Sequence, residues 1–338
     1  FGQSTTNRVT QVSQSYGVER EPVYTLNQKS FSDLTGGAGF IGSHLVDALR
    51  GMGSKVWILD NLSTGKKENI DHSVGHIEFI EGDIRDITTC QRACENIEYI
   101  FHQAALGSVP RSIQDPSTSI SVNVTGTVNV FTAARDQGAL RVIYASSSSV
   151  YGNSQKLPRR EGQEGMPISP YALSKMMDEQ LASIFSKIYD MEFIGLRYFN
   201  VYGPRQDPNG PYAAVVPQFL KAALEGTDPK IYGDGEQTRD FMFVQDVVRA
   251  NMLAAGAPKN ACGSFYNVGS GKAVSINELA RRIAELSGRD WQPIYLPPRE
   301  GDVKISLADI RSATEALGFE SAYDLSKGLS ESFLAMKP

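Results

Sequence analysis

Short apolar runs alternate with amphipathic segments from about residue 30 onward. Runs rich in β-branched and aromatic residues predict strands at 55–60, 76–83, 98–105, 141–147 and 192–199. Between them, apolar positions recur at helical spacing over 42–53, 86–96, 117–137 and 171–189. Strands that alternate with helices imply a parallel sheet covered by helices on both faces. We therefore predict an α/β fold with a doubly wound parallel sheet.

The pattern loosens after residue 200, where Pro and Gly cluster in 201–212, 231–236 and 295–302. The run 241–255 resembles a strand followed by a helix, and it could return to the first sheet. We predict a first domain over 29–200, rejoined by about 240–268, and a smaller interleaved C-terminal domain over most of 201–338. Residues 1–28 lack a clear period and predict a polar tail or arm.

The predicted first strand disagrees with this scheme. It should be a buried apolar run, but the chain reads KSFSDLTGG over 29–37. Ser30, Ser32 and Asp33 are poor residues for a central parallel strand. Either this strand is weakened, or the sequence before Leu34 is altered or foreign.

Composition narrows the class of protein. The 338 residues are 41% hydrophobic, enough for a sizeable core, and the net charge of -5 argues against non-specific nucleic-acid binding. Cys90, Cys94 and Cys262 lack the spacing of a metal site, so we expect free thiols, no metal ion and a cytoplasmic location. No apolar run reaches transmembrane length, and we expect no membrane partner.

Three glycines, Gly36, Gly39 and Gly42, open the first predicted helix. Glycines let the backbone approach a pyrophosphate, which is favoured at a helix N-terminus. Asp60 ends the next strand, 18 residues after Gly42. A carboxylate there can accept from ribose hydroxyls and would repel a 2′-phosphate. This Rossmann-type pattern favours NAD over NADP, although an ordinary turn would also explain the glycines.

Tyr171 and Lys175 are spaced i and i+4 at the start of a predicted helix, so they share one face. An isolated pair of this kind is usually a surface pair. The functional interpretation is a phenol whose anion is stabilised by the ammonium and by a positively charged nicotinamide, which makes it a base. The serines of YASSSSVYG, residues 144–152, could supply the hydroxyl partner at a strand end.

With these three elements in order, the chain resembles the extended short-chain dehydrogenase/reductase superfamily over about 34–320. Within it, the segments 102–113, 196–215 and 299–310 are similar to bacterial UDP-N-acetylglucosamine 4-epimerases. The resemblance implies that Ser147, three positions before Val150, hydrogen-bonds the sugar 4-oxygen and relays its proton to Tyr171. Dehydratases carry Asp and Glu at the next two positions, and decarboxylases keep the Glu. Here Ser148 and Ser149 cannot supply that acid–base pair.

The resemblance also implies two sets of binding residues. The cofactor set is Gly36, Gly39, Phe40, Ile41, Gly42, Asp60, Asn61, Asp83, Ile84, Gln103, Ala104, Ala105, Asn123, Tyr171, Lys175 and Phe199. The substrate set is Gly107, Ser108, Ser147, Ser148, Asn200, Val215, Tyr232, Arg239, Arg299, Asp302 and Ser306. In 4-epimerases a Tyr at the position of Ser306 narrows the sugar pocket, so the small residue here favours N-acetylated sugars.

We therefore expect an NAD-dependent enzyme that interconverts UDP-GlcNAc and UDP-GalNAc and is weaker on UDP-Glc and UDP-Gal. The family usually dimerises through the helices at 117–137 and 171–189, so we expect a homodimer. A UDP-sugar dehydratase or decarboxylase of the same superfamily is one alternative. A non-catalytic NAD-binding regulatory protein is the other, because the polar first strand leaves it open.

Overall fold

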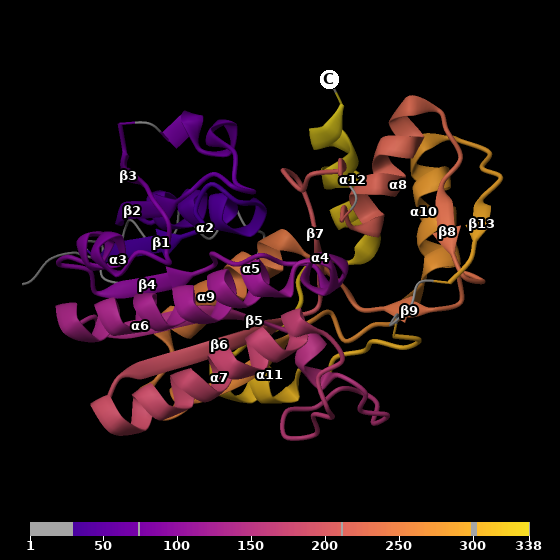
Figure 1. The fold of residues 1–338 in the computed structure, drawn as a ribbon. Helices are drawn as coiled ribbons and strands as arrows, with labels where there is room; N and C mark the ends of the chain where they lie inside the picture. The colour runs from indigo at the N-terminus through magenta and orange to yellow at the C-terminus, as the bar shows by residue number, and fades with distance from the viewer. Residues whose placement is uncertain (1–29, 74, 211, 299–302, 338) are drawn as a thin grey trace, which may run out of the picture.

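A seven-stranded parallel sheet forms the centre of the molecule (Figure 1). The computed structural model describes residues 30–73, 75–210, 212–298 and 303–337. The strand order of the seven-stranded sheet is β11-β6-β5-β4-β1-β2-β3. The strands are β1 (Phe31–Thr35), β2 (Lys55–Asp60), β3 (Ile77–Glu81), β4 (Tyr99–His102), β5 (Arg141–Ser147), β6 (Glu192–Tyr198) and β11 (Ser264–Val268). The predicted doubly wound Rossmann-type sheet is confirmed, and the order reverses beside β1, where ligands of such folds bind.

Two helical layers cover the sheet, because alternate residues of each buried strand face opposite sides. One layer contains α2 (Phe40–Gly51), α9 (Val244–Gly256) and α11 (Arg311–Leu317). The other contains α3 (Ile87–Ala93), α6 (Gly126–Gln137) and α7 (Pro170–Tyr189). In β4, for example, Ile100 faces the second layer and Phe101 faces the first.

The predicted helix at 117–137 is interrupted. It consists of α5 (Pro116–Ile120), a π-helical turn at Ser121–Thr125, and α6, which ends at Gly138 with a φ of 71°. The short helix α4 (Val109–Gln114) precedes it. Such π-helical turns often occur beside functional sites. This one carries Val122 and Asn123 towards the loop that follows β4.

A smaller lobe with its own apolar core lies to the right of the central sheet in Figure 1. It contains α8 (Val215–Glu225), α10 (Ile276–Ser287), α12 (Leu325–Met336) and the strand pair β8 (Lys230–Tyr232) and β13 (Ile294–Leu296). Two further strand pairs are β7 (Asn200–Tyr202) with β10 (Phe241–Phe243) and β9 (Thr238–Arg239) with β12 (Val274–Ser275). Short 3₁₀ turns occur at Lys67–Asn69, Asp71–Ser73, Ser148–Tyr151 and Lys259–Ala261. Because α9 packs on the large sheet and β11 is one of its strands, the chain crosses between the two parts more than once. The domain boundaries stay a prediction.

The polar first strand forms despite its composition. Each residue of β1 pairs in parallel with β2, and residues 32–35 also pair with β4. Ser32 and Asp33 are fully buried, and their side-chain oxygens have no hydrogen-bond partner. Burial raises the pKa of Asp33 well above its usual value. Backbone pairing by the neighbouring strands therefore overrides the poor strand preference of these side chains.

The three cysteines are free, as the sequence predicts. Burial raises the pKa of the Cys90 thiol to about 12 and that of Cys94 further, so neither is a reactive thiolate. None of the helices in the described ranges is both long and apolar enough to cross a membrane. The predicted tail at 1–28 lies outside the described residues.

Candidate active site

A pocket of about 560 Å³ opens at the carboxyl ends of the central strands. Its wall takes residues from the ends of β2 and β5 and from the loops after β1, β4 and β6. Loops that follow parallel strands gather at one edge of the sheet, which is where α/β folds bind ligands. One pocket therefore collects the glycine loop, the serine cluster and the Tyr171–Lys175 pair.

The glycine loop is shaped for close approach. Gly36 has a φ of +75°, and a Cβ at this position would lie 2.7 Å from the backbone nitrogen of Ala104. A Cβ at Gly42 would lie 2.1 Å from the Gly36 carbonyl oxygen. Helix α2 starts after Gly39 with no side-chain cap, so its first-turn N–H groups are available to an anion. This loop fits a dinucleotide pyrophosphate.

Asp60 is held rigidly at the end of β2. Its Oδ2 accepts a hydrogen bond from the Ala38 backbone at 3.0 Å, and its Oδ1 accepts one from Leu62 at 2.8 Å. Burial raises the pKa of this carboxyl, and the two backbone donors oppose that effect. Each oxygen keeps a lone pair for a further donor. A cofactor ribose whose hydroxyls reach this edge of the pocket would find oriented acceptors there.

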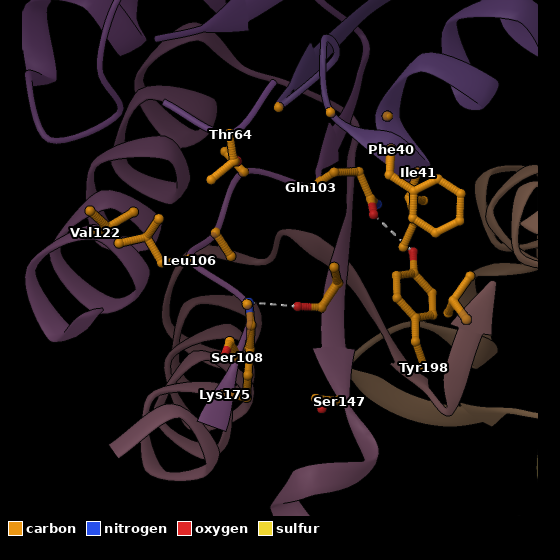
Figure 2. A pocket seen from close by; sticks show the side chains of 18 of the residues that line it. Phe40, Ile41, Thr64, Gln103, Leu106, Ser108, Val122, Ser147, Lys175 and Tyr198 are labelled. Carbon is orange, nitrogen blue, oxygen red and sulfur yellow. Dashed lines mark hydrogen bonds between the residues drawn. The ribbon is translucent and has the colours of Figure 1, made fainter. Parts of the chain in front are cut away.

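Lys175 reaches from α7 to the end of β5, as Figure 2 shows. Its Nζ donates to the Ala145 carbonyl at 2.9 Å, and the side chain is nearly fully buried. Helix α7 is fixed at its start, because Ser169 accepts from the Ala172 backbone at 3.1 Å and Pro170 occupies the first turn. The Tyr171 backbone donates to Ser112 at 3.1 Å. Tyr171 and Lys175 both line the pocket, as their helical spacing predicts.

The serine cluster contributes to the same pocket as this pair. Ser147 and Ser148 line the pocket, and Ser149 does not. The Ser149 backbone donates to the Ser147 hydroxyl oxygen at 3.1 Å. An oxygen that already accepts this bond is oriented so that its own proton is free to donate elsewhere. Ser147 is therefore the serine best prepared to bind a substrate oxygen.

Substituting the serines singly tests this assignment. We expect Ser147→Ala to lower turnover by about 10- to 100-fold, because it removes a hydrogen-bonding group at the reacting oxygen. Ser149→Ala is the matched control two residues along the chain. Because Ser149 does not line the pocket, this variant should keep turnover within about twofold of wild type. The measurement is the steady-state rate of each variant at saturating substrate. Equal, small losses at both positions would show that the serines form a turn and take no part in catalysis.

The pocket wall is braced by buried polar contacts. The Tyr198 hydroxyl donates to Gln103 at 3.1 Å and accepts from Asn251 at 2.9 Å, and Figure 2 shows the first of these bonds. Burial raises the pKa of Tyr198 to about 12, so this hydroxyl stays neutral and serves as a link. Asn123 accepts from the Leu106 backbone at 2.8 Å and donates to Ser174 at 3.0 Å. These bonds tie the loop after β4 to α7.

Most of the predicted site residues lie on this pocket wall. Asp83 and Asn123 do not: Asp83 accepts from Asn61 at 2.9 Å, and Asn123 acts behind Leu106. Val215 begins α8 next to Ala214, which does line the pocket. Tyr232, Arg239 and Ser306 lie in the smaller lobe and are not on the wall. Arg299 and Asp302 lie outside the described residues.

Sequence reasoning also missed several wall residues. Ser63 and Thr64 follow β2, so the rule that sites gather after strand ends could have found them. Leu106, Val122 and Tyr198 carry no chemical pattern that marks them, because they reach the pocket only through the tertiary fold. The others are Leu59, Gly82, Ala145, Ser146, Val201, Gln206 and Ala214.

Comparison with known proteins decides the family. The family described as "NAD dependent epimerase/dehydratase" matches residues 34–269. The chain belongs to this family. It is 42% identical to a UDP-glucose 4-epimerase of Mycolicibacterium smegmatis over 88% of this chain and 96% of that protein. It is 34% identical to UDP-glucuronic acid decarboxylase 1 of Xenopus tropicalis over 96% of this chain and 76% of that protein.

Solved structures agree with this assignment. The UDP-N-acetylglucosamine 4-epimerase of Methanobrevibacter ruminantium, in complex with UDP-N-acetylmuramic acid, superposes with a TM-score of 0.87. It is 40% identical, covering 91% of this chain and 98% of that one. The resemblance noted from the sequence is confirmed at the level of the family. NAD is the cofactor, and the glycine loop and Asp60 fit it.

Proposed function

We propose that the protein is a UDP-sugar 4-epimerase that interconverts UDP-GlcNAc and UDP-GalNAc. One observation carries the reaction type: among the described residues that line the pocket, Asp60 is the only carboxylate. Asp60 ends β2, which is three strands away from β5 and its serines. The reacting end therefore offers a phenol, an ammonium and hydroxyls. These suffice for proton transfer and lack the carboxylates that an elimination needs.

The chain's own residues would act in a short sequence. Ser147 donates to the sugar 4-oxygen and holds it beside Tyr171. Tyr171 takes the 4-hydroxyl proton, while Lys175 stabilises the phenolate. A bound NAD, held by the glycine loop and Asp60, would supply reversible hydride transfer at C4 of the sugar. Tyr171 then gives its proton back, so the protein and its cofactor end unchanged.

The smaller lobe would hold the uridine diphosphate in place while the sugar rotates to present its other face to the cofactor. We assign Asn200, Val215, Tyr232, Arg239, Arg299 and Asp302 to this task. Asn200 supports the assignment, because it lines the pocket at the start of β7. Arg239 follows Thr238 in β9, and the Ser306 backbone donates to the Thr238 carbonyl at 3.1 Å. Its guanidinium suits phosphate oxygens.

We attribute the preference for N-acetylated sugars to the room that small side chains leave in the sugar pocket for the 2-N-acetyl group. Gly107 and Ser108 on the pocket wall are small. Ser306 is not on that wall, but the resemblance to 4-epimerases implies that a Tyr at its position would narrow the sugar pocket. A specificity that depends on excluded volume can be imposed by one substitution. We expect Ser306→Tyr to lose UDP-GlcNAc and UDP-GalNAc turnover by at least about tenfold while sparing UDP-Glc and UDP-Gal. Rates on all four sugars test this, and undiminished conversion of UDP-GlcNAc by this variant would remove residue 306 as the gate.

We also propose a homodimer that pairs the helices at 117–137 and 171–189, which correspond to α5–α6 and α7. The outer face of α7 supports this, because Leu173, Ile184 and Ile188 are 44%, 50% and 67% exposed. Large apolar side chains on one face of a helix usually mark a contact surface.

A further inference from the structure

Lys175 shares its buried site with a carboxylate on the same helix. Asp178 lies one turn further along α7, and its Oδ2 is 3.2 Å from the Lys175 Nζ. The two side chains are only 1% and 3% exposed. Burying an ammonium costs free energy unless a charged partner compensates it, so the Asp178 carboxylate stabilises the buried Lys175 ammonium and is stabilised by it.

Two of the three N–H donors of the Lys175 ammonium are used within the protein. One goes to the Ala145 carbonyl at 2.9 Å and one to Asp178. The first contact fixes Lys175 against β5, and the second fixes it against α7. The third N–H remains for the pocket that Lys175 lines. Asp178 therefore determines where the remaining donor points without reaching the pocket wall itself.

The negative charge of the buried Asp178 carboxylate is stabilised mainly by Lys175. Its Oδ1 is buried with no hydrogen-bond partner, and the nearby Thr127 hydroxyl donates to the Asn123 carbonyl instead. Burial raises the pKa of Asp178 to about 6, and Lys175 opposes that shift most, followed by the Thr127 hydroxyl. The carboxylate thus has few stabilising donors apart from the ammonium.

Other ionisable groups face the pair from each packed element. Glu179, next on α7, is paired with Arg197 of β6 at 2.7 Å. Burial lowers the pKa of His102 on β4 to about 3, so it is neutral. Burial raises the pKa of Tyr144 on β5 well above its usual value, so it too is neutral. The charge that acts most directly on Lys175 is therefore that of Asp178.

We propose that Asp178 is a positioning residue that orients the Lys175 ammonium and sets how strongly its charge acts on Tyr171. The inference rests on the proposed function in taking Tyr171 as the base. An ammonium near a phenol favours the phenolate, and a carboxylate bonded to that ammonium offsets part of the effect. Removing the carboxylate's charge while keeping its shape should make Tyr171 easier to ionise.

The test measures the ionisation of Tyr171 directly in the NAD-loaded protein. Tyrosinate absorbance is titrated against pH, and the signal of Tyr171 is obtained by subtracting a Tyr171→Phe sample. In Asp178→Asn we expect the midpoint to fall by roughly one pH unit. The acid limb of kcat should move with it, while KM for the UDP-sugar stays within about twofold, a change of no more than ordinary context effects. Asp178→Ser provides a second neutral variant in case the first does not fold.

Two variants separate charge from packing. Asp178→Glu keeps the charge and should restore the wild-type midpoint. Asp246→Asn removes another buried carboxylate, one that accepts from the Ala322 and Tyr323 backbones away from the pocket, and it should leave the midpoint unchanged. A midpoint that is unmoved or raised in both neutral variants would overturn the proposal. The absorbance measurement needs no turnover. A shifted Tyr171 midpoint in a protein without epimerase activity would therefore contradict the proposed function and still support the role of Asp178.

Discussion

Tyr171→Phe should lower the interconversion of UDP-GlcNAc and UDP-GalNAc by about 100- to 10,000-fold, the usual contribution of a positioned acid–base group. The substitution removes only the phenol oxygen, and it leaves the ring on the pocket wall beside Lys175. The glycine loop and Asp60 are untouched, so the purified variant should still carry NAD. Turnover is measured with each UDP-sugar, and NAD is measured in the denatured protein.

Tyr189→Phe is the matched control for this loss. Tyr189 is the last residue of the same helix, is 43% exposed and lies outside the pocket wall. Its variant should keep the wild-type rate. A Tyr171→Phe protein that turns over as fast as Tyr189→Phe would remove Tyr171 from the mechanism.

Asp33→Val should stabilise the protein by on the order of 3 kcal/mol, because a buried polar group without a partner is costly. Asp33 is fully buried in β1, on the side that faces the layer with Cys90 and Cys94. Valine suits a buried parallel strand and fills this apolar side. The expected rise in Tm is roughly 5 °C for a protein of this size. Thermal unfolding at a fixed NAD concentration provides the measurement.

The gain from Asp33→Val should depend on pH in a defined direction. The pKa of Asp33 is raised in the folded state, whereas in the unfolded chain it is about 3.9. The unfolded state therefore releases this proton first, and wild-type stability falls as pH rises from about 4 towards the folded pKa. The gain should be smallest near pH 4 and grow above it. Asp33→Asn also removes the ionisation but keeps a polar group, so it should give a smaller gain that rises with pH in the same way. A Val variant less stable than wild type would contradict the account.

The sheet was largely predictable because its strands carry strong local patterns. The predicted strand at 141–147 coincides with β5, and the predicted helix at 171–189 starts one residue after α7 does. The strand β1 was uncertain for a physical reason: Ser32 and Asp33 disfavour a buried strand, and only pairing with β2 and β4 holds them there. The π-helical turn at 121–125 also escaped prediction, because its sequence SVNVT contains no proline or glycine that would mark an interruption of the helix.

The chemistry of the site was predictable only where residues sit at strand ends or at helical spacing. Gly36, Asp60, Ser147 and Tyr171 satisfy one of these rules, and they meet in one pocket. The contact between Asp178 and Lys175 satisfies the spacing rule too, but its importance comes from burial, which a single sequence does not reveal. Residues of the smaller lobe, such as Tyr232, follow no local rule, because their distance from the pocket depends on how that lobe packs.

Incubating the purified protein with UDP-GlcNAc alone, without added NAD or reductant, tests the central claim most directly. The products are separated by liquid chromatography and identified by the configuration at C4. An epimerase regenerates its bound cofactor in every cycle, so UDP-GalNAc should accumulate to an equilibrium that is also reached from UDP-GalNAc. A 4-keto product released into solution, or no change in the UDP-GlcNAc at all, would contradict the proposed function.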